Sequence, residues 1–474
     1  MGQEIGSSHF HKQDFTRFAQ RLAQETGLLQ AWFDDYRFAV GGPVVGYELE
    51  ACLIDAQGRP AALNEAWLAA VDDVDAYSPE LSRFNVELNG QPLALQADTL
   101  SRMEADLQQK WQHGQQVARG LDAQLLMIGI LPTLAEEMLS LGNMSAMTRY
   151  RALNEQILRL REGRPLQLDI QGEEHLKTEH GDVMLEAATT SFQLHLQVRQ
   201  PEAVRFYNAL QILSAPLVAI SANSPLLFGK RLWQETRIPL FEQAVAVGGT
   251  VQGGPASLRR VSFGTGYAQH SLFEVFEENW RHFPLLLPVI CDDVAEEMAH
   301  LRLHNGTIWR WNRPLIGFDA QGEPHLRIEH RVIPAGPSVL DSVANAALLF
   351  GLAFAMAREP ELEARLAFGD ARNNFYLAAR HGLGADVVWL DGQRGQLTAL
   401  LDYLLPQAEQ GLLQAGCERD EVEYYLAIIA ARLRRRQTGA HWQIAQFERY
   451  HGDLHALVAE YLTGQESGRP VHSW

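Results

Sequence analysis

The sequence is poor in cysteine. It has three among 474 residues, and Cys52, Cys291 and Cys417 lie far apart with no C-x-x-C pair. Zinc knuckles and disulfide frameworks need closely spaced or numerous cysteines, so this spacing indicates neither. Isolated thiols are typical of proteins in a reducing compartment. The cysteine usage therefore predicts a cytoplasmic protein.

Long hydrophobic runs and clusters of positive charge are also scarce. The apolar run at residues 285–290 is far too short to cross a bilayer, and no basic segment followed by an apolar one stands at the start. The formal net charge is -18, and no basic run is larger than residues 432–436, which we interpret as a solvent-exposed helix face. These features predict no membrane partner and no nucleic-acid partner.

The familiar glycine-rich phosphate motifs are missing as well. No Gly-x-x-x-x-Gly-Lys-Ser/Thr occurs, and the pair Gly264 and Gly266 lacks the third glycine of a dinucleotide fingerprint. A bound nucleotide would therefore be held through metal ions and arginines.

The composition is that of a soluble globular protein, 46% apolar and 21% charged. Periodicity predicts helices over residues 12–35, 97–120, 148–162 and 201–222, and a strand over 125–130. Two more strands are predicted between residues 307 and 332, around a turn at 319–322. Residues 248–266 contain six glycines and read as a long loop over a site.

Strands and helices are segregated rather than alternating, which favours an α+β fold with a mostly antiparallel sheet. We expect a catalytic α+β core over residues 1–340. A helical region over 341–474 would pack on it, the two forming one continuous domain.

Four apolar, strand-like segments carry acidic or imidazole side chains at every second position: residues 46–50 (GYELE), 84–89 (FNVELN), 192–198 (FQLHLQV) and 326–332 (LRIEHRV). Alternate side chains of a strand share a face, so Glu48 and Glu50 point the same way. Taken singly, each segment is better explained as an amphipathic strand with one face in solvent. The four together favour a shared site, and glutamates suit Mg²⁺, which prefers oxygen ligands and is commonly shared with substrate phosphates.

Three of these segments, 46–50, 84–89 and the part of the fourth at 327–331, together with 305–314 (NGTIWRWNRP), resemble motifs of the glutamate-cysteine ligase type 2 family in order and type. The resemblance runs over most of the chain. It implies a fold similar to the catalytic domain of glutamine synthetase, with a mostly antiparallel sheet lining the active site and helices flanking it. It also implies ATP- and Mg²⁺-dependent ligation, in which the γ-carboxylate of glutamate is phosphorylated and the amine of cysteine then displaces phosphate.

The resemblance implies roles for individual residues. Metal ligands around the ATP phosphates would be Glu48, Glu50, Glu87, Glu329 and His195, with Gln193 completing the substrate shell. Transfer of a phosphoryl group between anions needs positive charge, so Arg331, and secondarily Arg313, would bind the phosphate or acyl phosphate. Arg237 would hold the α-carboxylate of glutamate, and Glu235 would pair with Arg237 or with the substrate ammonium.

Several of these roles have plainer alternatives. His195 is equally well explained as a hydrogen-bonded structural histidine. A surface salt bridge is the alternative for Arg313 and Arg331, and for Arg327 it is the preferred reading. Trp309 and Trp311 could stack on adenine, but core packing is favoured.

The most direct functional hypothesis is synthesis of γ-glutamylcysteine from small-molecule substrates. Three alternatives stay open at this point. The same acyl-phosphate chemistry could serve another amine or carboxylate, because nothing in the sequence identifies a cysteine pocket. A phosphotransferase of related fold would stop at the phosphorylated product. A nucleotide-binding regulator would show no turnover.

Overall fold

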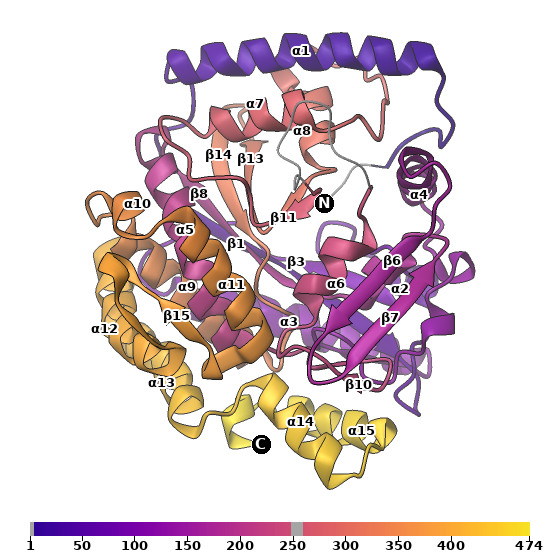
Figure 1. Cartoon of the computed structure of the whole chain (residues 1–474), viewed down its shortest axis with the longest axis vertical. Coiled ribbons are helices and arrows are strands. Elements are labelled where there is room, and N and C mark those ends of the chain that lie inside the picture. The colour runs from indigo at the N-terminus through magenta and orange to yellow at the C-terminus, as the bar shows by residue number, and fades with distance from the viewer. Residues whose placement is uncertain (1–3, 248–258) are drawn as a thin grey trace.

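The computed structural model describes residues 4–247 and 259–474, and its centre is one eight-stranded sheet (Figure 1). Six strands follow the order β13-β14-β8-β1-β3-β2, and β4 and β5 pair with β1. Every pairing in this sheet is antiparallel. The strands are β1 (Val44–Ile54), β2 (Tyr77–Pro79), β3 (Asn85–Asn89), β4 (Leu93–Ala94), β5 (Gln124–Leu126), β8 (Phe192–Val198), β13 (Asn312–Phe318) and β14 (Pro324–His330). The predicted α+β class with a mostly antiparallel sheet is confirmed.

The register of the sheet aligns the polar positions of neighbouring strands. Glu50 stands opposite Glu87, and Glu48 stands opposite Gln193. His195 lies between Gly46 of β1 and Glu329 of β14. Directly opposed residues of an antiparallel pair project to the same face, so the polar rows of β1, β3, β8 and β14 meet on one side of the sheet.

Two apolar helices cover the other face. They are α5 (Gln200–Ser221) and α9 (Val339–Met356), and nearly every position of each is buried. By length and composition both could cross a membrane, but 89% of each apolar window is buried inside the protein, as in the core helices of globular proteins. Behind α9 lies α12 (Leu397–Ala415), and a Cβ at Gly411 would overlap the backbone of Gly351. Glycine at this crossing lets the two helices approach closely.

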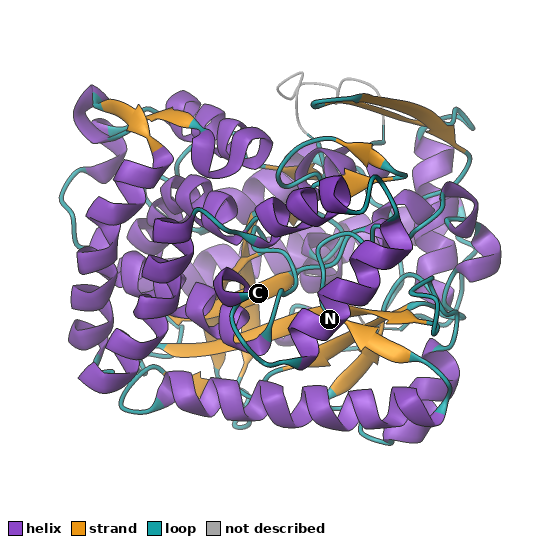
Figure 2. Ribbon diagram, turned by 90° about the horizontal axis from the view of Figure 1, so that it is seen from below, coloured by secondary structure: helices purple, strands orange, loops and turns teal. Residues whose placement is uncertain are grey.

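The polar face of the sheet is surrounded by other elements. These are α1 (Lys12–Asp34), α4 (Thr148–Leu160), α6 (Arg237–Ala244), α7 (Phe273–His282), α8 (Ala299–Asn305) and the hairpin of β6 (Leu166–Gln171) and β7 (His175–His180). In Figure 1, α1 runs along one end of the molecule with α7 and α8 beside it, while α4 and α6 stand nearer the hairpin. Figure 2 shows that helices form most of the outer layer and that the long strands lie between them, while short strand pairs lie at the upper edge.

Further elements complete the N-terminal two thirds. They include α2 (Asn64–Val71), α3 (Thr99–Gly120), β9 (Leu226–Leu227), β10 (Lys230–Arg231) and the parallel pair β11 (Val261–Ser262) and β12 (Trp309–Arg310). Helix predictions for 12–35, 97–120, 148–162 and 201–222 match α1, α3, α4 and α5 to within about two residues. The predicted glycine loop at 248–266 falls partly outside the described residues.

The chain beyond residue 338 is helical, as predicted, apart from the short hairpin of β15 (Asp386–Val388) and β16 (Arg394–Gln396). Its helices after α9 are α10 (Leu362–Arg365), α11 (Phe368–His381), α12, α13 (Arg419–Arg435), α14 (Gly439–Arg449) and α15 (Leu454–Glu466). The predicted division at residue 340 falls at the start of α9, a helix buried in the common core.

Two predictions differ from the structure. The strand expected over residues 125–130 ends at Leu126, because the next carbonyl, that of Met127, accepts hydrogen bonds from Tyr461 and Gln465 instead of a strand neighbour. The basic run at 432–436 is not wholly exposed. Arg432 is 1% exposed and pairs with Asp341 at 2.6 Å, because its position on α13 faces α9.

Candidate active site

A cleft with two lobes lies over the polar face of the sheet. The larger lobe, about 320 Å³, is walled by α4, α7, α8, β13 and β14, and the smaller, about 120 Å³, by β1, β3, α4 and α6. Residues lining both lobes are Glu48, Arg149, Leu153, Gly306, Trp309 and Arg313. The lobes are therefore neighbouring chambers with a shared wall.

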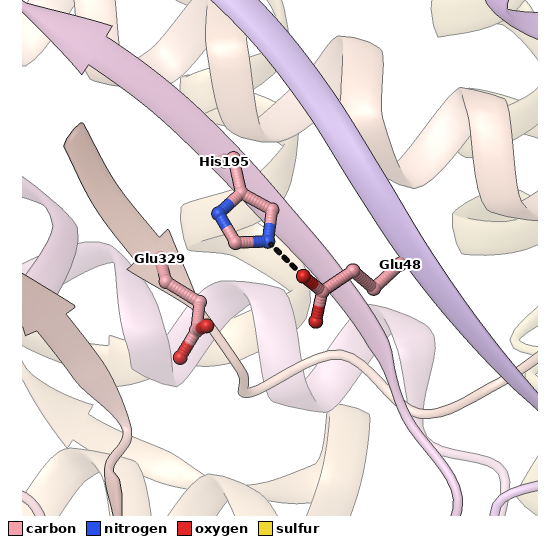
Figure 3. Close-up of side chains that lie close together, drawn as sticks. All are labelled: Glu48, His195 and Glu329. Carbon is pink, nitrogen blue, oxygen red and sulfur yellow. Dashed lines mark ion pairs between the residues drawn. The ribbon is translucent and has the colours of Figure 1, made fainter. Parts of the chain in front are cut away.

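Glu48, His195 and Glu329 meet at the junction of the lobes, each from a different strand (Figure 3). One potential ligand atom from each lies within 4.8 Å of the others, and His195 Nε2 is 3.4 Å from Glu48 Oε1. His195 is 7% exposed, and neither ring nitrogen makes a hydrogen bond within the described part of the chain. The polar contact of this imidazole is its ion pair with Glu48, while Nδ1 is buried without a partner among the described residues. Buried polar atoms are nearly always satisfied, so the open nitrogen suits a ligand position.

Two arginines hold Glu329. Arg313 donates from Nε and Nη2 to both carboxylate oxygens, each at 2.9 Å, and Arg331 Nη1 lies 3.0 Å from Oε2. Burial works to raise the pKa of Glu329, but the charges of Arg313 and Arg331 outweigh it and hold the pKa well below its ordinary value. The surface salt bridge considered for both arginines is wrong, because their ion pairs are buried in the cleft wall. A cation at the junction would share Glu329 with them.

The smaller lobe contains a second carboxylate cluster, formed by Glu50, Glu80 and Glu87, whose oxygens also come within 4.8 Å of one another. Glu87 accepts a hydrogen bond from Ser78 Oγ at 2.8 Å. Burial, with the charges of Glu48 and Glu50, raises the pKa of Glu87 to about 7, and burial raises the pKa of Glu50 and of Glu80 as well. These carboxylates are crowded and short of positive charge.

Sequence reasoning missed two residues of this lobe, Glu80 and Glu186. Glu80 follows β2 in a loop, and Glu186 lies in a short 3-10 helix, η3 (Met184–Ala188). Burial, together with the charge of Glu50, raises the pKa of Glu186 to about 7. Neither residue stands on an alternating strand, so period-two spacing could not reveal them.

Gln193 and Arg331 connect the two clusters. Gln193 Nε2 donates to Glu50 Oε1 at 2.9 Å, while Arg331 Nη1 donates to Gln193 Oε1 and also contacts Glu329. Both residues line the smaller lobe. The guanidinium of Arg331 is thus held in a fixed orientation between the two sets of carboxylates.

The structure does not place Arg237 and Glu235 in the cleft. Glu235 is fully buried and accepts hydrogen bonds from Asn223 N, Ser224 Oγ and Arg237 Nε. Arg237 is 2% exposed, and its remaining N–H groups donate to the carbonyls of Arg331 and Val332. The substrate-binding role expected for this pair is therefore corrected to that of a buried brace behind Arg331.

The remaining predictions for this region concern Trp311, Trp309 and Arg327. Trp311 is 1% exposed, donates to Glu242 and packs on Phe241, as expected of a core residue. Trp309 instead lines both lobes. Arg327 lines the larger lobe and makes no ion pair within residues 4–247 and 259–474, so the surface salt bridge preferred for it is wrong.

The donor sets fit a hard divalent cation. Each cluster offers carboxylate oxygens in one small volume, and the junction adds the imidazole of His195. Mg²⁺ takes oxygen ligands and usually shares them with phosphates, so two such clusters at neighbouring chambers suit an anionic substrate bound between them.

A family model described as Glutamate-cysteine ligase family 2 (GCS2) matches residues 44–460. Among solved structures, a glutamate-cysteine ligase from Francisella tularensis in complex with AMP aligns with a TM-score of 0.52 at 11% identity, covering 90% of each chain. A bifunctional glutathione synthetase from Pasteurella multocida aligns with a TM-score of 0.50 at 12% identity, covering 92% of this chain and 54% of that one. No curated protein matches the sequence. At these identities the structural matches show a shared fold.

Proposed function

The chain belongs to glutamate-cysteine ligase family 2, a family of carboxylate-amine ligases, and on this premise we propose that it is an ATP-dependent glutamate-cysteine ligase. It would form γ-glutamylcysteine through γ-glutamyl phosphate, releasing ADP and phosphate. The observation that carries the proposal is the junction of the lobes, where Glu48, His195 and Glu329 lie beside Arg313 and Arg331.

We place the nucleotide in the larger lobe. Its wall combines apolar side chains, among them Leu301 and Ile316, with Arg302 and Arg327. Apolar surface suits a purine and its sugar, while arginines suit phosphate oxygens. With the base in this lobe, the terminal phosphate would reach the junction with the smaller lobe.

The smaller lobe would hold the glutamate. Its volume of about 120 Å³ suits a small amino acid, and its walls include Pro79, Leu81, Tyr150 and Phe241. The apolar side chains stand among carboxylates and arginines, which would bind the charged groups of the amino acid.

Two sets of residues would hold Mg²⁺, one at the junction (Glu48, His195, Glu329) and one in the smaller lobe (Glu50, Glu80, Glu87). When bound, Mg²⁺ supplies the positive charge that lets an anionic carboxylate approach an anionic phosphate.

The arginines of the junction act on the transferring group. A γ-carboxylate oxygen of glutamate attacks the terminal phosphorus of ATP, and the bond to the β-phosphate oxygen breaks, releasing ADP. Arg331, oriented by Glu329 and Gln193, would donate hydrogen bonds to the phosphoryl oxygens during this step, and Arg313 would assist from the shared wall. The amine nitrogen of cysteine then attacks the acyl carbon, loses a proton and displaces phosphate.

The protein would act in the cytoplasm on small molecules. Its three cysteines are free, as expected in a reducing compartment.

Incubation with ATP, Mg²⁺ and glutamate, followed by a panel of amines, tests the proposal. Phosphate release coupled to γ-glutamylcysteine formation is expected with cysteine. ADP release without an amide product would favour a kinase, and coupling to another amine would replace cysteine as the acceptor.

A further inference from the structure

Among the carboxylates that line the smaller lobe, Glu186 belongs to neither of the two proposed cation clusters. Glu50, Glu80 and Glu87 have oxygens within 4.8 Å of one another, whereas Glu186 is not part of this group among the described residues. It nevertheless lines the same lobe, from η3 rather than from the sheet. Glu186 therefore faces the same chamber from a different wall.

The side chain of Glu186 lacks a hydrogen-bond or ion-pair partner among the described residues. Among residues 4–247 and 259–474, no donor lies within hydrogen-bond distance of its carboxylate and no cation within ion-pair distance. The nearest positive charges belong to Arg331 and Arg149, and Arg331 is already bonded to Glu329 and Gln193. A half-buried carboxylate gains from a nearby counter-charge, so a cationic group brought by the substrate would be stabilised there.

We propose that Glu186 binds the α-ammonium group of the amino acid whose side-chain carboxylate is phosphorylated. This inference rests on the proposed function and adds a specificity-determining residue to it. The ammonium of an amino acid carries three hydrogen-bond donors, and the carboxylate of Glu186 accepts no hydrogen bond from the described residues. The γ-carboxylate of the same molecule would point to the clusters of Glu48 and Glu50 on the sheet.

The consequence is selection for a zwitterionic donor. Arg149 lines the same lobe and its charge acts on Glu186, so the lobe presents a carboxylate and a guanidinium together. An α-amino acid offers the complementary pair of charges. A dicarboxylate such as glutarate, which has the reacting carboxylate but no amine, would leave Glu186 unpaired.

Calorimetric binding of L-glutamate and glutarate, with Mg²⁺ and a non-hydrolysable ATP analogue, tests the inference. Wild type should bind glutamate roughly 10- to 100-fold more tightly than glutarate, the span of a charged hydrogen bond. Glu186→Gln should lose most of that preference by weakening glutamate alone, while Glu186→Asp should keep part of it. Glu137→Gln, which removes an exposed carboxylate from a short helix elsewhere, is the matched control and should behave as wild type.

Four results would overturn the inference. Equal loss of both ligands in Glu186→Gln, with an unchanged melting temperature, would assign Glu186 to the cation site. Unchanged binding of both ligands by Glu186→Gln would show that Glu186 takes no part in binding. If wild type binds glutamate and glutarate equally, the lobe has no site for the ammonium of glutamate. If Glu186→Gln changes only the KM for the acceptor amine, Glu186 binds the ammonium of the acceptor instead.

A second assay separates this inference from the proposed function. Hydroxylamine traps an acyl phosphate as a hydroxamate without any amine acceptor. If wild type makes no glutamate-dependent hydroxamate, the proposed ligase chemistry fails, while the calorimetric preference still decides the role of Glu186. If hydroxamate forms but glutamate and glutarate bind alike, the ligase stands and the inference falls.

Discussion

The two carboxylate clusters of the cleft are built from the same residue type but stand in opposite electrostatic states. At the junction, Glu329 is held by Arg313 and Arg331, and its pKa is well below the ordinary value. In the smaller lobe, burial and neighbouring carboxylates raise the pKa of Glu87 to about 7. At the junction the arginines outweigh the burial of Glu329, whereas the arginines that line the smaller lobe do not offset the burial and mutual repulsion of its carboxylates. Replacing a glutamate by glutamine should therefore destabilise the protein at the junction and relieve charge repulsion in the smaller lobe.

The largest expected effect is on turnover in the smaller lobe. Glu87→Gln removes a proposed cation ligand, so the rate of ADP formation should fall by about 1,000-fold, as when an electrostatic contact to the transition state is lost. The free energy of unfolding without Mg²⁺ should meanwhile rise by about 1 kcal/mol, because repulsion from Glu48 and Glu50 is relieved. Steady-state kinetics and urea unfolding measure the two quantities. Activity near wild type would remove Glu87 from the cation site.

The same substitution at the junction should have the opposite effect on stability. Glu329→Gln leaves Arg313 and Arg331 without their shared buried carboxylate, which should cost about 3 kcal/mol in the free energy of unfolding. Activity should be lost as well. Glu323→Gln, in an exposed pair with Arg37, is the control and should change stability by less than about 1 kcal/mol. Equal stability of the two variants would mean that the arginines are not anchored by Glu329.

Arg331→Lys tests the link between the clusters. A lysine has a single ammonium and cannot reproduce the planar contacts to Glu329 and Gln193, so the kcat should fall by about 100-fold with a smaller change in KM. Arg37→Lys, on the surface, should leave both constants unchanged. A loss expressed only in KM for ATP would mean that Arg331 binds the nucleotide without acting on the transferred group.

The smallest effect concerns pH. The pKa of Glu87 is about 7 in the folded protein against an ordinary value of 4.5, so the folded state binds more protons than the unfolded state between these values. Without Mg²⁺, the free energy of unfolding should therefore fall by about 1 to 2 kcal/mol as the pH rises from 5 to 7.5. Glu87→Gln should flatten this slope. Glu329 acts in the other direction and outside this window, since its stabilisation is lost only as the pH falls below 4.5.

Chemical unfolding at a series of pH values, with and without Mg²⁺, measures this slope. A slope that is identical in wild type and Glu87→Gln would show that Glu87 does not titrate in this range.

Period-two spacing predicted the residues that β1, β3, β8 and β14 bring to one face, because a strand fixes the side to which each residue points. Glu48, Glu50, Glu87, His195 and Glu329 are all placed there. The spacing could not supply the strand order or the register, which set His195 beside Glu329 rather than beside Glu87.

The residues that were missed or wrongly predicted are those whose position depends on tertiary packing. Glu80 and Glu186 reach the cleft from a loop and a 3-10 turn, where no periodicity assigns a face. Arg237 was expected at the substrate, yet its guanidinium donates to the carbonyls of Arg331 and Val332. In the basic run at 432–436, Arg432 is buried because the turn of α13 faces it toward Asp341.

The central claim is that this cleft phosphorylates the γ-carboxylate of glutamate before the amide forms. Glutamate labelled with ¹⁸O in its γ-carboxylate, incubated with ATP, Mg²⁺ and cysteine, tests it directly by mass spectrometry of the released phosphate. The account predicts one ¹⁸O in each phosphate formed along with γ-glutamylcysteine, because a carboxylate oxygen leaves on the phosphoryl group. Unlabelled phosphate would contradict the acyl-phosphate route.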